Sequence, residues 1–393
     1  MPQVKPEVET FARIKVVGVG GSGSNAIDHM INTKVRGVEF IAINTDAQDL
    51  HTSLAKKKIH IGKNLTKGLG AGMNPEIGKR AIEETKEEVQ EAMKNADMVF
   101  ITCGLGGGTG SGASSVAAQV AKEIGALTVA VVTKPFFFEG RQRGKIAENA
   151  LDELRKEVDA IIVIPNDRLL SNISKETTAE NAFAMCDDVL KQAVEGISDL
   201  ITTPGIINID FADVRAILKE SGSALMGVGI ASGEKRAEEA AKMAINSPLL
   251  DLSVNGARGV LFSIAGGSDL TMFEIQEAAK IITESMDPDA KVIFGTVKDE
   301  KLKKGDVRVT IIASGFPESV SNKKSLFGNV IQNRVEEEAK EETTSGKIFN
   351  SLGITRKEEV VKEEVKEEVK PTANDDDDEW GAVPAFLRRS KIK

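Results

Sequence analysis

The sequence predicts an α/β protein: a mostly parallel sheet with helices on both faces, then a long helix and a second, smaller α/β domain. From Ile14 onward, short apolar segments alternate with amphipathic ones, which is the order that builds βαβ units. Hydrophobic residues make up 41% of the chain but aromatic residues only 4%, so aliphatic side chains must fill the core, as in buried parallel strands. Glycines gather in three dense segments, each placed before an expected helix.

Five segments of the first part have the length and the Val and Ile content of buried strands. They are Ile14–Val19, Glu39–Asn44, Met98–Thr102, Leu127–Val132 and Ala160–Ile164. Helices are expected between them. In Pro75–Lys94, for example, Asn74 can cap the helix and Pro75 suits its first turn.

A long helix is expected over Thr178–Leu200, ended by Pro204-Gly205. Apolar residues recur there every three or four positions, which predicts a helix packed along one side: Phe183, Cys186, Leu190, Val194, Ile197 and Ile201. A second α/β unit should run from about Ile206 to Phe316. It should close with two neighbouring strands, Lys291–Val297 and Asp306–Ala313.

The expected organisation is a flexible N-terminus (1–13), a nucleotide-binding domain (14–177), the central helix (178–203), a second domain (204–316), an acidic linker (317–379) and a terminal peptide (380–393). The linker carries Lys-Glu-Glu-Val repeats and Asp375–Asp378, too few apolar groups to offset the entropy of ordering. We predict that it is disordered, with a charge-paired surface helix as the alternative. The terminal peptide turns apolar again from Trp380, which favours a docking peptide over a stray tail.

Charge and cysteine content exclude several classes of protein. The net charge is -9 and there is no run of Lys and Arg, so a nucleic-acid groove is not expected. Cys103 and Cys186 lie in different elements with no secretory signal ahead of them, which indicates a reduced, cytoplasmic protein without disulfides. No apolar run approaches the roughly 20 residues that cross a bilayer, so no direct membrane insertion is expected. No Cys/His spacing indicates a metal site.

The first glycine cluster, Gly18–Asn25, follows a strand and opens a helix. Glycines let the backbone approach an anion, and a helix N-terminus offers free N–H groups and partial positive charge. Gly18, Gly20 and Gly23 also satisfy GxGxxG, and Asp46 stands near the position of a ribose-binding acid. From this loop alone, two alternatives stay open. The protein is a dinucleotide-dependent oxidoreductase, or the loop is a tight turn that binds nothing.

A second cluster, Gly104–Gly112, follows another strand and opens another helix, and a third, Gly70–Pro75, also ends at a helix start. Two glycine loops at one edge of a parallel sheet can hold a polyphosphate from two sides, whereas a dinucleotide fold needs only one. No GxxxxGK[ST] sequence is present. The pattern therefore favours a Rossmann-like domain in which backbone N–H groups and hydroxyls, and not a lysine, bind the phosphates.

These segments resemble the tubulin/FtsZ family, and more closely its FtsZ branch. Gly106–Gly112 (GGGTGSG) is similar to the family's signature loop. The other matching segments occur in the family's order: the first loop with Asn25, Ala71–Pro75, Lys134–Arg141, Ile164–Asp167 and Asn208–Arg215. The resemblance covers about Ile14 to Phe316. The terminal segment Val383–Arg389 is similar to the family's adaptor-binding peptide, and its Pro384–Leu387 favours the bacterial division members over archaeal and other relatives.

The resemblance implies a GTPase that polymerises head-to-tail into the division ring at mid-cell, with GTP, GDP and Mg²⁺ as ligands and membrane-tethering adaptors on 380–393. It implies a nucleotide-binding set in which the glycine loops wrap the phosphates, Ala71 and Gly72 lie near the γ-phosphate, and Glu139 and Arg143 face the ribose and phosphates. That set is Gly20, Gly21, Ser22, Gly23, Ser24, Asn25, Asn44, Asp46, Ala71, Gly72, Gly104, Gly107, Gly108, Thr109, Gly110, Glu139, Arg143, Asn166, Phe183 and Asp187.

Asn166, Phe183 and Asp187 would surround guanine. A carboxylate that accepts from N1–H and the 2-amino group selects guanine over adenine. By spacing alone Asp188 could replace Asp187, and by periodicity Phe183 reads as a core residue. Ser22, Ser24 and Ser114-Ser115 depart from the family's pattern, although these small residues keep the loops passable.

The resemblance also implies that Asn208, Asp210 and Asp213 orient the attacking water, acting on the nucleotide of a neighbouring subunit. The plain alternative for Asp210 is a helix cap. Asp187 and Leu200 are separated by about 20 Å of helix at ~1.5 Å per residue, so these carboxylates should not return to their own nucleotide. A head-to-tail contact of this kind does not close on itself and gives a filament. A non-catalytic nucleotide-binding scaffold remains the second alternative.

Overall fold

The computed structural model describes residues 12–170, 177–203, 205–247, 256–299, 302–303 and 305–316. The linker, the terminal peptide and nearly all of the predicted flexible N-terminus lie outside these ranges. The strands form one sheet in the order β3-β2-β1-β4-β5-β6-β7-β10-β8-β9. No helix in the described ranges is long and apolar enough to span a bilayer.

The first part of the sheet is parallel throughout. Its strands are β1 (Ile14–Val19), β2 (Val38–Asn44), β3 (Lys57–His60), β4 (Met98–Gly104), β5 (Leu127–Lys134) and β6 (Ala160–Pro165). The five predicted strands are all present. Sequence reasoning missed β3, because Ile59 is the one buried residue in this short edge strand and basic residues flank it.

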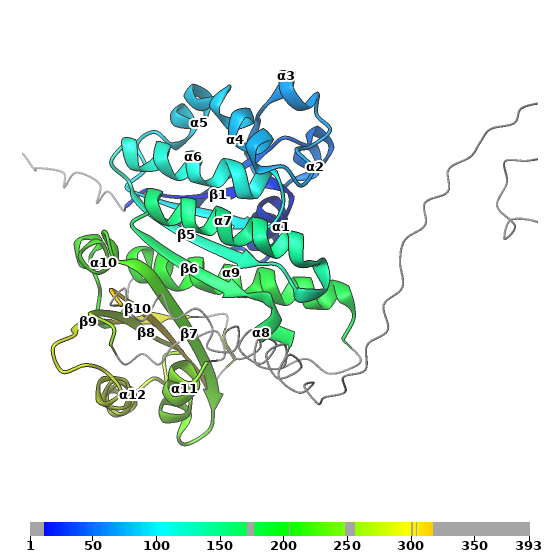
Figure 1. The fold of residues 1–393 in the computed structure, drawn as a ribbon. Helices are drawn as coiled ribbons and strands as arrows, with labels where there is room; N and C mark the ends of the chain where they lie inside the picture. The colour runs from blue at the N-terminus through cyan, green and yellow to red at the C-terminus, as the bar shows by residue number, and fades with distance from the viewer. Residues whose placement is uncertain are drawn as a thin grey trace, which may run out of the picture. The chain divides into compact units, whose positions relative to one another are not determined.

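Helices cover both faces of these strands, as Figure 1 shows. They are α1 (Gly20–Asn32), α2 (Ala47–Thr52), α3 (Lys63–Thr66), α4 (Pro75–Glu83), α5 (Lys86–Met93), α6 (Thr109–Glu123), the 3₁₀ turn η1 (Phe137–Glu139), α7 (Arg141–Glu157) and α8 (Asn166–Leu170). Side chains alternate between two cores: Val16 packs with α1 and α9, and Val17 packs with α4, α5, α6 and α7. This alternation is the period of two that a strand imposes.

The helix predicted over Pro75–Lys94 is wrong in one respect: the segment forms two helices, α4 and α5, that part at Thr85. Thr85 leaves the helical conformation at φ -124° and ψ 22°. Its hydroxyl donates to the Ala81 carbonyl at 3.3 Å. A threonine that hydrogen-bonds the preceding turn competes with the helical ladder.

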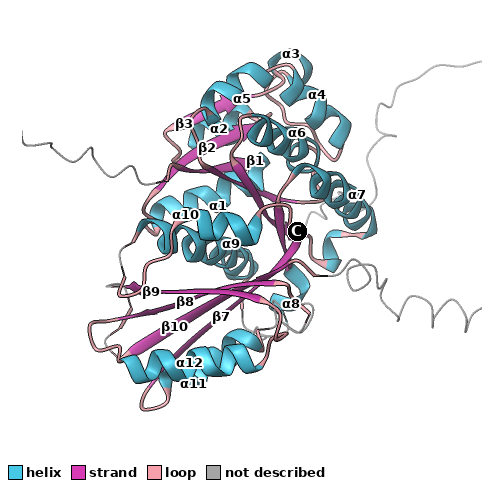
Figure 2. Cartoon of the chain, turned by 90° about the vertical axis from the view of Figure 1, so that its left-hand side faces the viewer, coloured by secondary structure: helices cyan, strands magenta, loops and turns pink. Residues whose placement is uncertain are grey.

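The second part begins with the long helix and ends on a mixed sheet. Its elements are α9 (Ala179–Thr202), α10 (Phe211–Leu218), β7 (Gly222–Ser232), α11 (Arg236–Ile245), β8 (Gly259–Gly266), α12 (Met272–Glu284), β9 (Lys291–Lys298) and β10 (Asp306–Ser314). The strand β7 extends the parallel sheet through a short ladder that starts at Ala160 and Gly222. Helices α11 and α12 cover one face of this mixed sheet (Figure 2), and α9 packs on the other.

The expected pairing of the last two strands is wrong. The strand β10 lies between β7 and β8 and is antiparallel to both, while β9 pairs with β8. Val309–Ser314 of β10 is buried throughout, as a central strand requires, whereas β9 has exposed residues at both ends. A short polar turn between two strands therefore did not make them neighbours.

Candidate nucleotide site

Two neighbouring parallel strands, β1 and β4, end at the same edge of the sheet, and each leads into a glycine loop and a helix. A cavity of about 460 Å³ opens between the loops. Its lining comes from the ends of strands and the starts of helices: Val19, Gly20, Gly21, Ser22, Asn25, Gly104, Leu105, Gly107, Thr109, Gly110, Thr133, Pro135, Glu139, Arg143, Asn166, Phe183, Cys186 and Asp187. Ligand sites of open α/β sheets lie in this position.

The helices α1 and α6 begin at the cavity without a capping side chain. By contrast, Asn74 caps α4 and Thr178 caps α9 through side-chain oxygens. An uncapped first turn leaves N–H donors and partial positive charge for an anion. Two such turns facing one cavity can bind a polyphosphate.

The glycines of the two loops permit close packing of backbone against backbone. Gly20 has φ +74°, and a Cβ there would lie 2.9 Å from the Gly110 nitrogen. Gly107 differs: a Cβ built on it meets no atom within 4 Å, although the residue lines the cavity. A side chain at Gly107 would therefore enter the space of a ligand.

The third glycine segment supports the second loop from outside. A Cβ at Gly108 would collide with the Gly72 carbonyl and contact Ala71. Neither Ala71 nor Gly72 lines the cavity. This segment therefore holds the second loop in place, and Asn74 then caps α4 by accepting from Glu76 N–H at 3.1 Å.

Three lining residues, Asn166, Phe183 and Asp187, have side chains of the types that recognise a nucleotide base. Phe183 is 46% exposed, so it is not the core residue that its periodicity suggested. Asn166 is only 5% exposed, and its side-chain oxygen has no hydrogen-bond partner among the described residues. Such a buried acceptor needs a donor, which a ligand in the cavity can supply.

Asp187 and Asp188 have different surroundings. Asp187 lines the cavity, and burial raises the pKa of its carboxyl to about 6, with the nearby Asp188 adding to the rise. Asp188 instead contacts His29, with 2.9 Å between Oδ1 and Nε2. The structure thus separates two carboxylates that spacing alone could not separate.

An aromatic segment closes one side of the cavity. Glu139 accepts from Phe136 N–H at 2.9 Å and pairs with Arg143 at 2.9 Å. Phe137 N–H donates to Asp167 at 2.9 Å. The rings of Phe136 and Phe183 meet edge to face with centroids 5.3 Å apart, so this segment fixes the position of the base-facing phenyl ring.

The three predicted catalytic residues lie away from the cavity, whose lining contains none of them. Asp210 caps α10 by accepting from Asp213 N–H at 2.8 Å, and Asn208 accepts from Gly205 N–H at 2.7 Å. Helix α10 leads into β7, whose first residue pairs with the first residue of β6. Figure 1 shows α10 and α8 at opposite ends of α9.

Comparison with known proteins identifies the two parts of the chain. The model of the tubulin/FtsZ family GTPase domain matches residues 13–174, and that of the FtsZ family C-terminal domain matches residues 222–317. An empty FtsZ dimer from M. jannaschii is 47% identical, with a TM-score of 0.75 over 78% of this chain and 89% of that chain. CetZ1 of Haloferax volcanii, a GDP-bound monomer, is 23% identical, with a TM-score of 0.67 over 78% and 94%.

The chain belongs to the tubulin/FtsZ family. The predicted α/β fold, the GTPase activity and the class of polymerising cytoskeletal proteins are thereby confirmed. CetZ1 shares the fold only, at its lower identity. The more specific prediction of a bacterial origin stays a prediction.

Within this tubulin/FtsZ fold, the cavity collects most but not all of the predicted nucleotide-binding residues. Seven of them do not line it: Gly23, Ser24, Asn44, Asp46, Ala71, Gly72 and Gly108. Gly23 packs α1 onto the carbonyl of Thr102, and Asp46 caps α2. Sequence reasoning missed five lining residues: Val19, Leu105, Thr133, Pro135 and Cys186. Thr133 and Pro135 stand at the end of β5, where the topology alone could have indicated them.

Proposed function

We propose that this tubulin/FtsZ family chain binds GTP in the described cavity and hydrolyses it when a second copy contributes its α10 segment. Repetition of that contact would build a head-to-tail filament of the division ring at mid-cell. The observation that carries this proposal is the separation of the two halves of the site. The glycine loops lie at the carboxyl edge of the parallel strands, and α10 leads back to their amino edge.

The phosphates would lie over the uncapped first turns of α1 and α6, with Ser22, Asn25 and Thr109 as side-chain donors. Guanine would lie against Phe183. The Asp187 carboxylate, which lines the cavity, would accept from N1–H and the 2-amino group. Asn166 would add a further polar contact through its unpartnered amide oxygen.

Mg²⁺ fits as a metal held mainly by phosphate oxygens and waters. Among the described residues no group of three or more His, Cys, Asp or Glu side chains could hold a metal by itself. Asp46 and Asp49 nevertheless lie beside the first loop, and burial with repulsion from Asp46 raises the pKa of the Asp49 carboxyl. A Cβ at Gly21 would lie 3.7 Å from Asp49 Oδ2. These oxygens suit an outer shell, and the ion would neutralise charge on the β- and γ-phosphates.

Asn208, Asp210 and Asp213 would orient the attacking water at the γ-phosphate of the adjacent copy. Asp210 and Asp213 share one side of the first turn of α10, because residues three apart are neighbours on a helix. Asp210 already serves as a cap through one oxygen. Its second oxygen and the Asp213 carboxylate remain to receive a proton from water.

Large exposed apolar side chains occur in chain segments next to both halves of the site. We define the pocket-mouth surface as Leu69, Met73, Phe137 and Phe138, and the catalytic-loop surface as Ile206, Met272 and Phe273; all seven are exposed. Large exposed apolar side chains that gather in patches mark contact sites. Two different surfaces on one molecule make a heterologous contact, which does not close and so propagates.

The deciding experiment measures hydrolysis against protein concentration. Hydrolysis should rise more steeply than linearly with protein concentration, so that specific activity increases, and GTP should sediment the protein where GDP does not. Asp210→Asn should bind GTP normally and hydrolyse it roughly 100-fold more slowly. Gly107→Val should not bind GTP, yet mixing it with Asp210→Asn should restore hydrolysis, because each supplies the half that the other lacks. Constant specific activity far below the assembly concentration, without complementation, would refute the shared site.

We extend the proposal to the terminal peptide, residues 380–393. Its apolar residues beyond an acidic spacer would bind a membrane-tethering division adaptor. Deleting Trp380–Lys393 should leave hydrolysis and sedimentation within about twofold of the full chain and abolish recruitment to adaptor-bearing vesicles. Loss of assembly in solution would place the peptide in the filament instead.

A further inference from the structure

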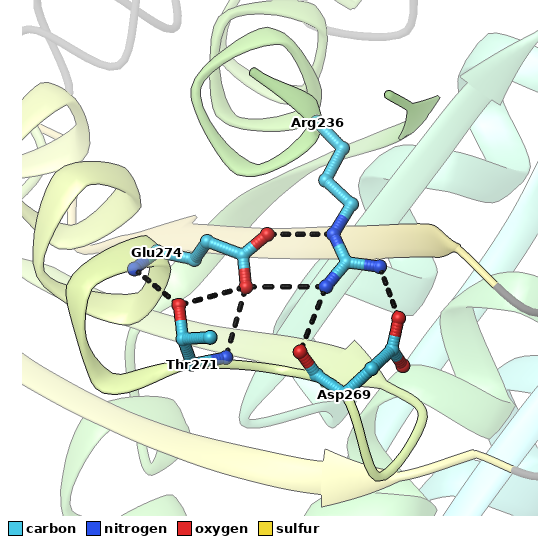
Figure 3. Close-up of polar contacts among 4 residues, drawn as sticks. All are labelled: Arg236, Asp269, Thr271 and Glu274. Carbon is cyan, nitrogen blue, oxygen red and sulfur yellow. Dashed lines mark hydrogen bonds and ion pairs between the residues drawn. The ribbon is translucent and has the colours of Figure 1, made fainter. Parts of the chain in front are cut away.

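An ionic cluster around the buried Arg236 joins the start of α11 to the start of α12 (Figure 3). We call Arg236, Asp269, Thr271 and Glu274 the Arg236 clamp. Arg236 Nε donates to Glu274 at 2.6 Å, and its Nη1 donates to Asp269 at 2.7 Å. The guanidinium also donates to the Asp269 carbonyl at 3.0 Å, so one side chain holds both the loop and the helix that follows.

The clamp extends into the cap of α12. Glu274 accepts from the backbone N–H and the hydroxyl of Thr271, each at 2.9 Å, and Thr271 Oγ1 accepts from Glu274 N–H at 3.3 Å. The guanidinium hydrogen bond is the main reason that the pKa of Glu274 falls to about 2. The carboxylate is therefore charged at neutral pH.

The position of Arg236 is electrostatically unfavourable except for its two carboxylates. It is the first residue of α11, and it faces the N-terminus of α12. Both helix ends carry partial positive charge, which disfavours a cation. The arginine side chain is only 8% exposed, and a buried ion pair of this kind is weak evidence for stability. A geometric role accounts for it better, since a guanidinium fixes two carboxylates in direction as well as distance.

The segment held by the clamp adjoins the loop that carries the catalytic candidates. A second cavity, of about 320 Å³, lies between Gly266–Leu270 and Gly205–Ile206, with β9 at its base. Ile206 and Ile207 both donate their N–H groups to Thr296 Oγ1 at 2.9 Å. None of the clamp residues lines this cavity, but Ser268 and Leu270, the chain neighbours of Asp269, do. The loop that Arg236 holds and the loop that carries the catalytic candidates thus both reach the end of β9.

The clamp also determines the direction of two side chains of the catalytic-loop surface. Met272 and Phe273 are the first two residues of α12, directly after Thr271, and they are 65% and 67% exposed. Their direction depends on how α12 begins. Glu274 fixes that beginning, because it closes the capping box while it binds Arg236.

We propose that Arg236 is a positioning residue for the shared active site: it orients the catalytic-loop surface so that a second copy of this chain docks in register with Asp210 and Asp213. The inference rests on the proposed head-to-tail function. Arg236 does not touch the nucleotide; it acts through Asp269 and Glu274 on the surface that the neighbouring copy meets.

The test compares Arg236→Lys and Asp269→Asn with Glu238→Gln as the matched control. A lysine offers a single point charge and cannot span two carboxylates. Asp269→Asn removes only the loop's ion pair and leaves the cap of α12 intact, so it keeps the test valid if the lysine variant folds poorly. Glu238 pairs with Lys242 at 2.6 Å on the outside of α11, so the control loses an ion pair of the same helix outside the clamp.

Both clamp variants should bind GTP as the wild type does, within about twofold, because the nucleotide cavity lies in the other domain. Their hydrolysis at a concentration that assembles the wild type should fall roughly tenfold, since small misplacements far from the reacting atoms carry costs of this order. The control should match the wild type in both measurements.

Mixing Arg236→Lys with two different variants distinguishes a positioning role of Arg236 from a general loss of folding. Mixing Arg236→Lys with Gly107→Val should restore hydrolysis, because the latter presents an intact catalytic-loop surface to a functional pocket. Mixing Arg236→Lys with Asp210→Asn should not, because neither presents a working surface. Hydrolysis that stays at the wild-type level in both clamp variants, or that both mixtures restore equally, overturns the role of Arg236. If the wild type itself shows constant specific activity and no sedimentation with GTP, the proposed function fails, and the clamp proposal fails with it.

Discussion

At the carboxyl edge of the sheet, α1 and α6 begin without a capping side chain, whereas α10 begins at Asp210, whose carboxylate already accepts the Asp213 N–H. The first region leaves donors and one buried amide oxygen unpaired. At the start of α10, by contrast, Asn208 and Asp210 accept hydrogen bonds from backbone N–H groups of their own segment. The pocket thus has polar groups left for a ligand, while the start of α10, which carries the proposed catalytic residues, is held by its own hydrogen bonds.

This contrast teaches how the two halves should respond to mutation. Substitutions at Gly107 and Asn166 should change ligand affinity with little effect on folding, because neither residue has a side-chain hydrogen bond to another described residue. Substitutions at the start of α10 should change stability as well as hydrolysis, because the same carboxylate serves both. The three predictions below use this difference, in order of decreasing effect.

The largest effect is expected for Gly107→Val. A side chain there meets open space within the cavity and no protein atom, so it should displace phosphate without disturbing the loop. Losing two hydrogen bonds to a charged phosphate, at roughly 1.5–3 kcal/mol each, would weaken GTP binding about 100-fold or more. Titration with a fluorescent GTP analogue measures this affinity.

The matched control is Gly144→Val, which also faces open space but lies on α7 outside the cavity lining. It should bind GTP normally. Thermal unfolding of both variants without nucleotide should resemble that of the wild type. A Gly107→Val protein with normal GTP affinity would show that the phosphates do not occupy this loop.

An intermediate effect is expected for Asp187→Asn. The amide loses a charged acceptor and turns an N–H donor toward the 2-amino group, which should weaken GDP binding roughly 30-fold or more. The same amide matches xanthine, whose 2-oxo group accepts a hydrogen bond. Competition titrations with GDP and XDP should therefore reverse their order in this variant, and an unchanged order would leave Asp187 outside the base site.

The pH dependence of Asp187 follows from its pKa, which burial raises from the ordinary value of 3.8 to about 6. The empty folded protein holds this proton more tightly than the unfolded chain does. Its contribution to stability is complete below about pH 4 and is lost as the pH rises through 6. GDP needs the carboxylate, so GDP affinity should instead fall as the pH drops through 6. Asp187→Asn should abolish both trends and raise the melting temperature of the empty protein at pH 8.

How much the sequence could predict differs between the same two regions. Glycine runs after Val- and Ile-rich strands are local signals, so the phosphate loops and the strands β1, β4 and β5 could be placed before the structure was known. The lining residue Cys186 could not, because it reaches the cavity from α9, whose position depends on packing. Similarly, no local pattern indicated that β10 would insert between β7 and β8, or that Thr85 would divide the helix.

The catalytic segment shows the other limit of sequence reasoning. Asn208, Asp210 and Asp213 were recognised by resemblance, but their distance from the pocket is a property of the fold. Thr271 and Glu274 show the spacing of a capping box, but no sequence signal linked Arg236 to them, since it lies 33 to 38 residues from Asp269 and Glu274 along the chain. Contacts of that separation arise only once α11 and α12 pack side by side.

The smallest effect concerns stability at the start of α10. Asp210→Asn keeps a side-chain oxygen that can accept the Asp213 N–H, whereas Asp210→Ala removes the cap and should destabilise the protein by about 1 kcal/mol. Both variants lose the carboxylate and should hydrolyse GTP equally slowly. Urea unfolding measures the difference in free energy, with Thr178→Ala, which removes the cap of α9, as a cap control far from α10. Equal stability of the two Asp210 variants would mean that the carboxylate has no part in the fold. Faster hydrolysis by Asp210→Asn than by Asp210→Ala would mean that the cap geometry, and not the negative charge, is what the neighbouring nucleotide requires.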